Sequence, residues 1–313
     1  MSEALANRLQ PCGPVRDPEA AARLHERLAE AADADGWRAT LDAAWAALEP
    51  VFAASPYLAG LARRWPDRLQ RTLDADPEAR LADILAATDA LTGAPDEAKA
   101  PLRHLKAELH LLTALCDLGG VWDLDQVTGA LSRFADAAAR AALRITADDW
   151  RRRGRLISAP DDPRGPVPGL FVLAMGKGGA FELNYSSDID LSLFYEPEAL
   201  QSALAEGVEM QGFANRLAQG LTALLAERTA DGYVFRVDLR LRPDPSSTPP
   251  AVAAPMALAY YESVGQNWER AAFIKARVCA GDAAEGAAFL KALVPYIWRR
   301  SLDYQAVLDI QSI

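Results

Sequence analysis

Apolar residues along the first half of the chain recur at the spacing of one helix face. The clearest stripe runs from Leu102 to Cys116 in steps of 3, 4, 3 and 4 residues. Gly119-Gly120 follows the stripe and predicts the end of this helix. His104 and His110 lie off the stripe, so we expect both on the surface of the helix.

Two helix starts are marked by an aspartate that precedes a proline. Asp17-Pro18 and Asp76-Pro77 each place an N-cap side chain before a residue suited to the first helical turn. A further amphipathic segment runs from Asp125 to about Arg153. The pattern therefore predicts that roughly the first 155 residues are helical.

The pattern changes after residues 157–169, a segment rich in proline and glycine that predicts a linker. Leu170–Ala174 is a short apolar run typical of a buried strand, and Ser187–Tyr195 alternates as a strand does. Farther along, the pattern predicts a helix over 197–228, a strand over 233–242, a loop over 243–250 and helices from about Met256 onward. Many helices with a few strands predict an α+β fold that is mainly helical.

Composition narrows the class of protein. Of the 313 residues, 50% are hydrophobic and 24% charged, as in soluble globular proteins, and no run of about 18 apolar residues predicts a membrane span. The net charge of −10 argues against a nucleic-acid coat, which needs a cationic surface. Three widely spaced cysteines exclude a disulfide framework and suit a reducing cytoplasm. With only three histidines, histidine-based catalysis is a poor first hypothesis.

Asp188 and Asp190 are the first candidates for chemistry. Residues two apart in a strand face the same side, so the two carboxylates lie together while Ile189 and Leu191 face the core. Adjacent carboxylates repel each other, and a divalent cation would neutralise them. The alternative is a solvated polar strand edge, and the pair alone does not decide between the two.

The strand predicted at 233–242 has a charged face opposite its apolar one. Arg236, Asp238, Arg240 and Arg242 alternate with apolar residues. Asp238 is a candidate third metal ligand, and Arg240 and Arg242 are candidates to neutralise phosphate, because guanidinium groups grip phosphate oxygens in pairs. Arg236 could equally pair with a surface acid. The alternative for the whole face is an exposed strand with a salt-bridged aspartate.

A glycine-rich turn separates the first two predicted strands. Glycines let backbone N–H groups approach an anion, so Gly176, Lys177 and Gly179 are candidates to cradle phosphate. The turn matches neither a P-loop nor the dinucleotide GxGxxG pattern. Ser187, directly before Asp188, either donates to a phosphate oxygen or caps the start of the strand.

Together these parts resemble the DNA polymerase β-type nucleotidyltransferases. More narrowly, AMGKGGAFELNYSSDIDLSLFY (174–195) resembles the signature of the glutamine synthetase adenylyltransferase/adenylyl-removing enzymes. That family's second and third blocks resemble RVDLRLRPD (236–244) and YYESVGQNWERAAFIKARVCAGD (260–282), and its helical region resembles LKAELHLLTALCDLGGVWDLDQVT (105–128). The sequence departs from the family pattern at Ala174, Gly178 and Phe181, which belong to the turn and leave the carboxylates intact.

The resemblance implies three regions: a helical N-terminal region over 1–122, a nucleotidyltransferase catalytic domain over 123–255 and a helical C-terminal region over 256–313. The chain stops at Ile313 in apparent mid-helix, so we expect a truncated last region and a fragment of a longer protein. Family members carry two such catalytic domains, one that adenylylates a tyrosine of glutamine synthetase and one that removes the AMP. The position of the motif and the block that begins at Tyr260 favour the adenylyl-removing half.

The activity implied by the resemblance is phosphorolysis of adenylyl-O-tyrosine on adenylylated glutamine synthetase, which consumes inorganic phosphate and releases ADP. Asp188, Asp190 and Asp238 would hold one or two Mg²⁺ ions. The resemblance also implies the PII signal protein and glutamine as regulators of the full-length enzyme, a cytoplasmic location, and no nucleic-acid or membrane partner. The alternatives are adenylylation from ATP and a regulatory or docking module without catalysis.

Overall fold

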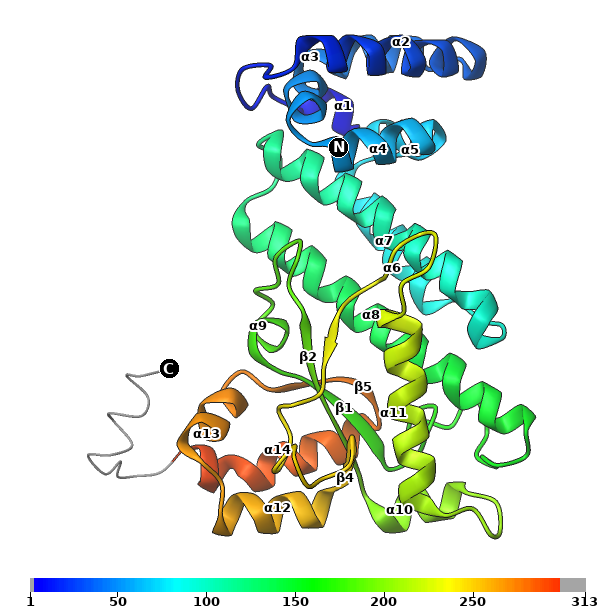
Figure 1. The fold of residues 1–313 in the computed structure, drawn as a ribbon, viewed down its shortest axis with the longest axis vertical. Coiled ribbons are helices and arrows are strands. Elements are labelled where there is room, and N and C mark those ends of the chain that lie inside the picture. Colours follow the sequence, from blue (N-terminus) through cyan, green and yellow to red (C-terminus); the bar gives the residue numbers. More distant parts are fainter. Residues whose placement is uncertain (1–2, 299–313) are drawn as a thin grey trace. The chain divides into compact units, whose positions relative to one another are not determined.

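The computed structural model of the chain describes residues 3–298, which divide into two units (Figure 1). The first unit holds the described residues up to Thr88 together with His104–Phe134, and the second holds Asp89–Arg103 and the described residues from Ala135 on. The prediction of a mainly helical α+β fold is confirmed. The predicted end of the chain in mid-helix lies outside the described residues, and the three regions expected from the resemblance stay a prediction.

Helices alone build the first unit. Asp17 accepts a hydrogen bond from the Ala20 N–H at 2.9 Å and Asp76 from the Ala79 N–H at 3.0 Å, so both predicted caps are confirmed. Helices α7 and α8 contribute residues to both units. The helices in chain order are α1 (Leu5–Arg8), α2 (Pro18–Asp35), α3 (Arg38–Ala54), α4 (Pro56–Arg64), α5 (Pro66–Asp74), α6 (Pro77–Asp89), α7 (Pro95–Leu118) and α8 (Leu124–Arg152). Within residues 3–298, no helix has both the length and the apolar character needed to cross a bilayer.

The prediction that His110 lies on a helix surface is wrong. The residue is 6% exposed, and its Nδ1 atom lies 3.0 Å from the Tyr57 hydroxyl. Burial lowers the pKa of His110 to about 3, so the ring is neutral near pH 7. The periodicity misleads here because α7 is buried on nearly all sides from Ala107 to Cys116, not only along the apolar stripe.

A five-stranded mixed sheet forms the core of the second unit. Strand β1 runs antiparallel to β2 on one side and to β5 on the other. Strands β3 and β4 both pair in parallel with β2, β3 at its start and β4 at its end. The strands are β1 (Leu170–Ala174), β2 (Ile189–Tyr195), β3 (Val237–Asp238), β4 (Ala251–Ala253) and β5 (Arg277–Gly281).

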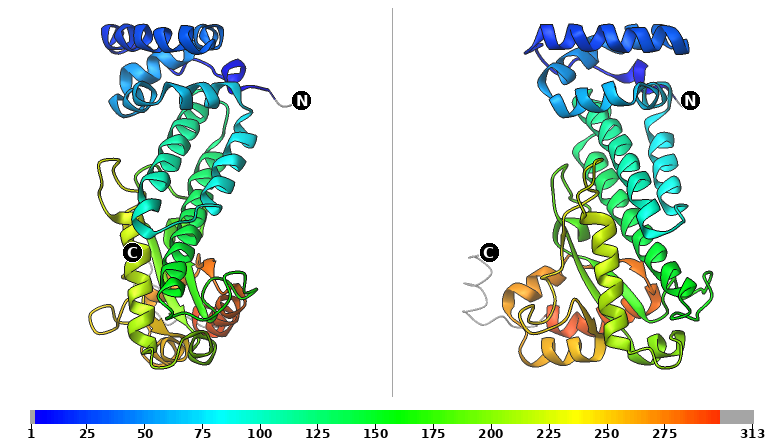
Figure 2. Two further views of the ribbon diagram at one scale, coloured as in Figure 1. Left: turned by 90° about the vertical axis from the view of Figure 1, so that its right-hand side faces the viewer. Right: turned by 45° about the vertical axis from the view of Figure 1, so that its right-hand side comes forward.

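Helices cover the sheet because its strands are apolar on both faces. On one face, Phe171 and Phe194 pack with side chains of α12 (Ala254–Ser263) and α14 (Ala283–Ile297). The rings of Phe194 and Phe289 stack with their centroids 4.6 Å apart. On the other face, Leu191 of β2 lies close to the part of α8 that begins at Ala135. Helix α11 (Met210–Ala226) contacts β3 and β4 and runs alongside the sheet (Figure 2).

Three predicted elements differ from the structure. The helix expected over 197–228 is interrupted, since α10 (Pro197–Ala203) ends well before α11 and Gly207 in between has a φ of +78°. Only Val237–Asp238 of the strand expected over 233–242 is paired, because β4 occupies the parallel position beside the rest of β2. The chain from Met256 is not all helical, since β5 lies between α13 (Asn267–Phe273) and α14.

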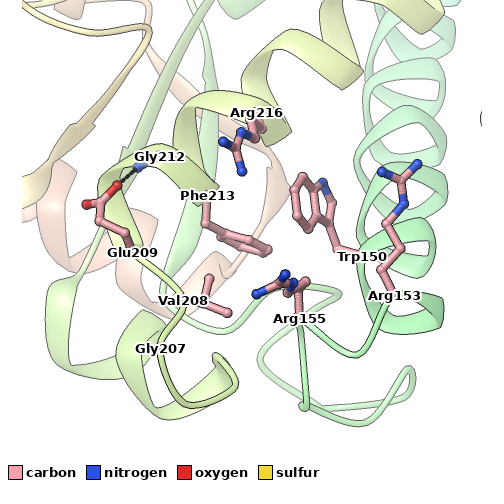
Figure 3. A pocket seen from close by; sticks show the side chains of 9 residues that line it. All are labelled: Trp150, Arg153, Arg155, Gly207, Val208, Glu209, Gly212, Phe213 and Arg216. Atoms are coloured by element: carbon pink, nitrogen blue, oxygen red, sulfur yellow. Dashed lines mark hydrogen bonds between the residues drawn. The ribbon is translucent and has the colours of Figure 1, made fainter.

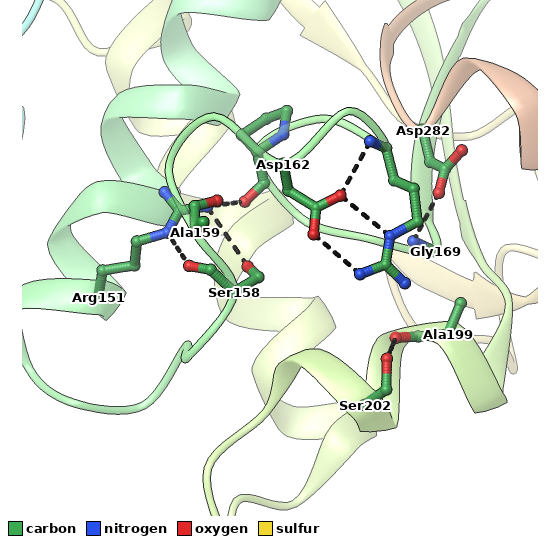
Figure 4. Close-up of polar contacts among 10 residues, drawn as sticks. Arg151, Ser158, Ala159, Asp162, Gly169, Ala199, Ser202 and Asp282 are labelled. Carbon is green, nitrogen blue, oxygen red and sulfur yellow. Dashed lines mark hydrogen bonds and ion pairs between the residues drawn. The ribbon is translucent and has the colours of Figure 1, made fainter.

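The predicted linker over 157–169 contains neither helix nor strand, and side chains fix its course (Figure 4). Arg151, near the end of α8, donates to the carbonyl oxygens of Ser158 and Ala159 at 2.8 and 3.3 Å. At the other end, the buried Asp282 carboxylate accepts from the Gly169 N–H at 2.9 Å and also caps α14. These contacts anchor the linker at both of its ends, the second of them directly before β1.

Candidate active site

Strand pairing brings Asp190 and Asp238 side by side. They are register partners in the parallel pair of β2 and β3, so their side chains leave the same face of strands that lie about 4.8 Å apart. Asp188 lies two residues earlier, in the irregular segment directly before β2. Burial raises the pKa of Asp190, and the negative charges of Asp238 and Asp188 raise it further. The three predicted carboxylates therefore lie within electrostatic reach of one another.

Two arginines accompany these carboxylates. Arg236 donates to Asp188 through its Nε atom at 2.6 Å, so the surface acid that it pairs with is a predicted metal ligand. Arg240 donates to Asp238 through its Nε atom at 2.8 Å, and its hydrogen bonds lower the pKa of the Asp238 carboxyl. Asp190 has no ion-pair partner within residues 3–298, so its charge is the least balanced of the three.

The donor set suits a magnesium ion by its chemistry. Mg²⁺ prefers carboxylate oxygens, and a cation would relieve the repulsion that Asp190 experiences from its two neighbours. In the part of the chain that the structure describes, no three or more histidine, cysteine, aspartate or glutamate side chains converge as metal ligands. Arg236 and Arg240 hold two of the three carboxylates, so a cation at this cluster would take the place of guanidinium groups. Metal binding by this cluster stays a prediction.

The glycine-rich turn forms the short helix α9 (Gly176–Gly179) between β1 and β2. A Cβ atom at Gly176, where φ is +53°, would lie 2.9 Å from Asp190 Oδ2, so glycine lets the turn approach the carboxylate. A Cβ atom at Gly179 would lie only 2.0 Å from the Lys275 carbonyl oxygen. Packing against backbone therefore requires Gly179, and the positive φ favours glycine at position 176, whether or not either residue binds phosphate. Lys177 between them is exposed.

Arg277 of β5 holds the glycine turn in place, a role that the sequence does not indicate. It donates to the carbonyl oxygens of Gly178 at 2.8 Å and Gly179 at 3.1 Å. Its two Nη atoms donate to the Asp136 carboxylate of α8 at 2.6 and 2.9 Å. Its guanidinium also lies 3.8 Å from the centroid of the Phe181 ring. The only signal in the sequence is Asp136 itself, a lone acid in an alanine-rich helical stretch.

The remaining predicted phosphate ligands, Ser187, Arg240 and Arg242, differ in how far their side chains are engaged by the protein itself. The Ser187 hydroxyl donates to Asn184 Oδ1 at 2.9 Å, so it closes the turn before β2, and its role toward phosphate stays a prediction. Arg242 donates to the carbonyl oxygens of Leu239 at 2.5 Å and Pro245 at 3.0 Å, so its guanidinium shapes the loop after β3. The side chain of Arg240 is 81% exposed, and it is the better placed of the two arginines to meet a ligand.

Fold and site together define a mainly helical α+β protein with a carboxylate cluster at the edge of a small mixed sheet. The sequence profile of the glutamate–ammonia ligase adenylyltransferase family matches residues 45–292. The chain belongs to this family, and the resemblance inferred from its motifs is confirmed.

Curated relatives agree with this assignment over nearly the whole chain. A bifunctional glutamine synthetase adenylyltransferase/adenylyl-removing enzyme of Caulobacter vibrioides is 63% identical over 99% of the chain. Enzymes with the same name from Bradyrhizobium sp. (strain ORS 278) and Xanthobacter autotrophicus are 50% and 49% identical over 98% and 91% of the chain. The chain spans 31%, 30% and 29% of the lengths of these three relatives, respectively, so it corresponds to a portion of such an enzyme.

Proposed function

We propose that this chain removes AMP from adenylylated glutamine synthetase by phosphorolysis. An oxygen of inorganic phosphate attacks the phosphorus of adenylyl-O-tyrosine, a new P–O–P bond forms, and the bond from phosphorus to the tyrosine oxygen breaks. The products are ADP and the free tyrosine side chain, whose oxygen takes up a proton. The observation that carries the proposal is the pairing of Asp190 with Asp238, with Asp188 beside them, in a chain of this family.

The three carboxylates would bind the metal ions of the proposed site. Asp188, Asp190 and Asp238 would hold one or two Mg²⁺ ions, which when bound polarise phosphoryl oxygens and stabilise the charge on the leaving group. The exposed Arg240 lies next to Asp238 and can bind a phosphate oxygen once it releases that carboxylate. The tyrosine leaving group has an ordinary pKa near 10, so no histidine is needed to protonate it in the transition state.

Asp190→Asn tests this proposal because it removes a charge and keeps the shape of the side chain. The chain is incubated with adenylylated glutamine synthetase, Mg²⁺ and inorganic phosphate, and ADP is measured. We expect a loss of at least about a hundredfold, which corresponds to about 3 kcal/mol of transition-state stabilisation. Asp161→Asn, an exposed aspartate of the linker, is the matched control and should retain full activity. Phosphate-dependent ADP release by Asp190→Asn at the rate of the unmodified chain would refute the metal role.

Adenylylation is the second candidate, because the names of the relatives carry both activities. The same carboxylate cluster could then serve transfer of AMP from ATP to the tyrosine. Incubation of unmodified glutamine synthetase with labelled ATP distinguishes the two reactions. Label on the tyrosine without phosphate-dependent release from the adenylylated form would assign the chain to the adenylylating reaction.

A further inference from the structure

A pocket of about 540 Å³ lies in the second unit, away from the carboxylate cluster (Figure 3). It is formed where the end of α8, the turn after it, the loop between α10 and α11, and the first turns of α11 meet. The pocket adjoins the far end of β2, since the Tyr195 hydroxyl donates to Gln211 of α11 at 2.8 Å. Asp190 lies five residues earlier on β2, which is about 17 Å along a strand. The volume of the pocket is in the range of pockets that bind small organic ligands.

Positive charge dominates the lining. Arg153, Arg155 and Arg216 contribute three guanidinium groups, and Glu209 is the only acid among the lining residues. The Glu209 carboxylate is already bound by the N–H groups of Gln211 at 2.8 Å and Gly212 at 2.5 Å, where it caps α11. The amide groups at the start of α11 therefore offset the negative charge of Glu209. The net charge of the pocket lining stays positive because of its arginines.

Two of the arginines have no ion-pair or side-chain hydrogen-bond partner in the part of the chain that the structure describes. Arg153 pairs with Asp149 at 2.6 Å, whereas neither Arg155 nor Arg216 forms an ion pair or a side-chain hydrogen bond within residues 3–298. The backbone of Arg155 is nevertheless fixed, because its N–H donates to the Trp150 carbonyl at 3.0 Å and its carbonyl accepts from the Ala205 N–H at 3.1 Å. Arg155 is thus anchored in place while its guanidinium is available.

Aromatic rings give the pocket an apolar wall. Trp150 and the buried Phe213 meet edge to face with their centroids 5.4 Å apart, and Arg216 lies 5.8 Å from the Trp150 ring. In Figure 3 the Arg155 and Arg216 side chains approach the two rings from opposite sides. Such a wall can contact the organic part of a ligand while the arginines contact its polar part.

We propose that this pocket binds a phosphate-bearing ligand between Arg155 and Arg216, at a site separate from the carboxylate cluster. Two unpaired planar guanidinium groups match the oxygens of a phosphate, which can accept paired hydrogen bonds from each. The organic part of a phosphate ester would lie against Trp150 and Phe213. The site does not depend on the proposed phosphorolysis, because none of its lining residues belongs to the cluster of Asp188, Asp190 and Asp238.

Calorimetric titration of the chain with AMP and, separately, with inorganic phosphate tests this site. We expect saturable binding that Arg155→Gln and Arg216→Gln each weaken by at least about tenfold, since each loses charge-assisted hydrogen bonds. Arg152→Gln is the matched control, an exposed arginine near the end of α8 that pairs with Asp149 outside the pocket, and it should bind normally. Binding of AMP alone would assign a phosphate ester, and equal binding of both would assign free phosphate.

Asp190→Asn separates this site from the candidate active site. The variant should lose ADP release but keep the component of binding that depends on Arg155 and Arg216. The proposal is overturned if neither probe binds, if Arg155→Gln and Arg216→Gln bind as the unmodified chain does, or if Arg152→Gln weakens binding as much as they do. Because both pocket arginines are exposed, these variants should fold, and circular dichroism confirms that they do.

Discussion

Replacement of Arg277 by glutamine should destabilise the second unit through the carboxylate that Arg277 neutralises. Asp136 is 9% exposed, and burial raises its pKa even though Arg277 opposes that rise. In Arg277→Gln, two charge-assisted hydrogen bonds to Asp136 are lost and the carbonyl oxygens of Gly178 and Gly179 lose their donor. Loss of one partner of a buried ion pair costs about 3–5 kcal/mol. The Arg277 side chain is 22% exposed, so water offsets part of the loss and we expect about 3 kcal/mol.

Urea unfolding measures this effect, and Lys275→Gln provides the control. Lys275 pairs with Glu182 at 2.7 Å, but both side chains are about half exposed, so removal of that pair should cost less than about 1 kcal/mol. Asp136→Asn combined with Arg277→Gln removes the buried charge and should recover part of the loss. A free energy of unfolding for Arg277→Gln that matches Lys275→Gln would refute the reasoning.

The pH dependence gives a second measure of the same contact. Without Arg277 the pKa of Asp136 should rise further above its ordinary value, because only burial and other charges then act on it. The folded state would then bind the proton more tightly than the unfolded state, so stability falls as the pH rises from about 4. The deficit of Arg277→Gln relative to the unmodified chain should therefore shrink toward pH 4 and be largest near neutrality. A deficit that is the same at both pH values would contradict this account.

Two further predictions follow from buried positions. Gly179→Ala should destabilise the second unit by at least about 1–3 kcal/mol in urea unfolding, because its Cβ would meet the Lys275 carbonyl, whereas Gly60→Ala, with open space around it in α4, should be neutral or stabilising. His110 has a pKa of about 3 in the folded chain, below its unfolded value near 6.5, so its stabilising contribution to the first unit should be lost as the pH falls through that window. The loss between pH 7 and pH 4.5 should be smaller in His110→Asn, and an equal loss would exclude His110 as its source.

The alternation of side chains was sufficient to find the carboxylate cluster but not its supports. Strand periodicity placed Asp188, Asp190 and Asp238 on charged faces, and pairing of β2 with β3 puts the latter two in register. The contact between Asp136 and Arg277 joins residues 141 positions apart, so no local pattern reports it. The antiparallel pairing of β5 with β1, in which Arg277 lies opposite Ala174, brings the two residues together.

Short elements were the least predictable part of the fold. Strand β5 has five residues with no alternation of apolar and polar side chains, and it is a strand because the edge of β1 offers it hydrogen-bond partners. For His110 the prediction failed in a different way. The helix that contains it was predicted correctly, but its burial was not. The burial of α7 is set by the helices packed around it, which periodicity along α7 alone does not describe.

Because β5 comes late in the chain, one edge of β1 stays unpaired for part of translation. Strand β1 is buried at all five positions in the folded chain, but its second neighbour is made about 100 residues later. A ribosome adds about 5–20 residues per second, so β1 presents an open, apolar edge for roughly 5–20 s. Open strand edges recruit strands of other molecules. During this interval the nascent chain can pair with strands of other molecules, and a chaperone that covers the edge of β1 would prevent it.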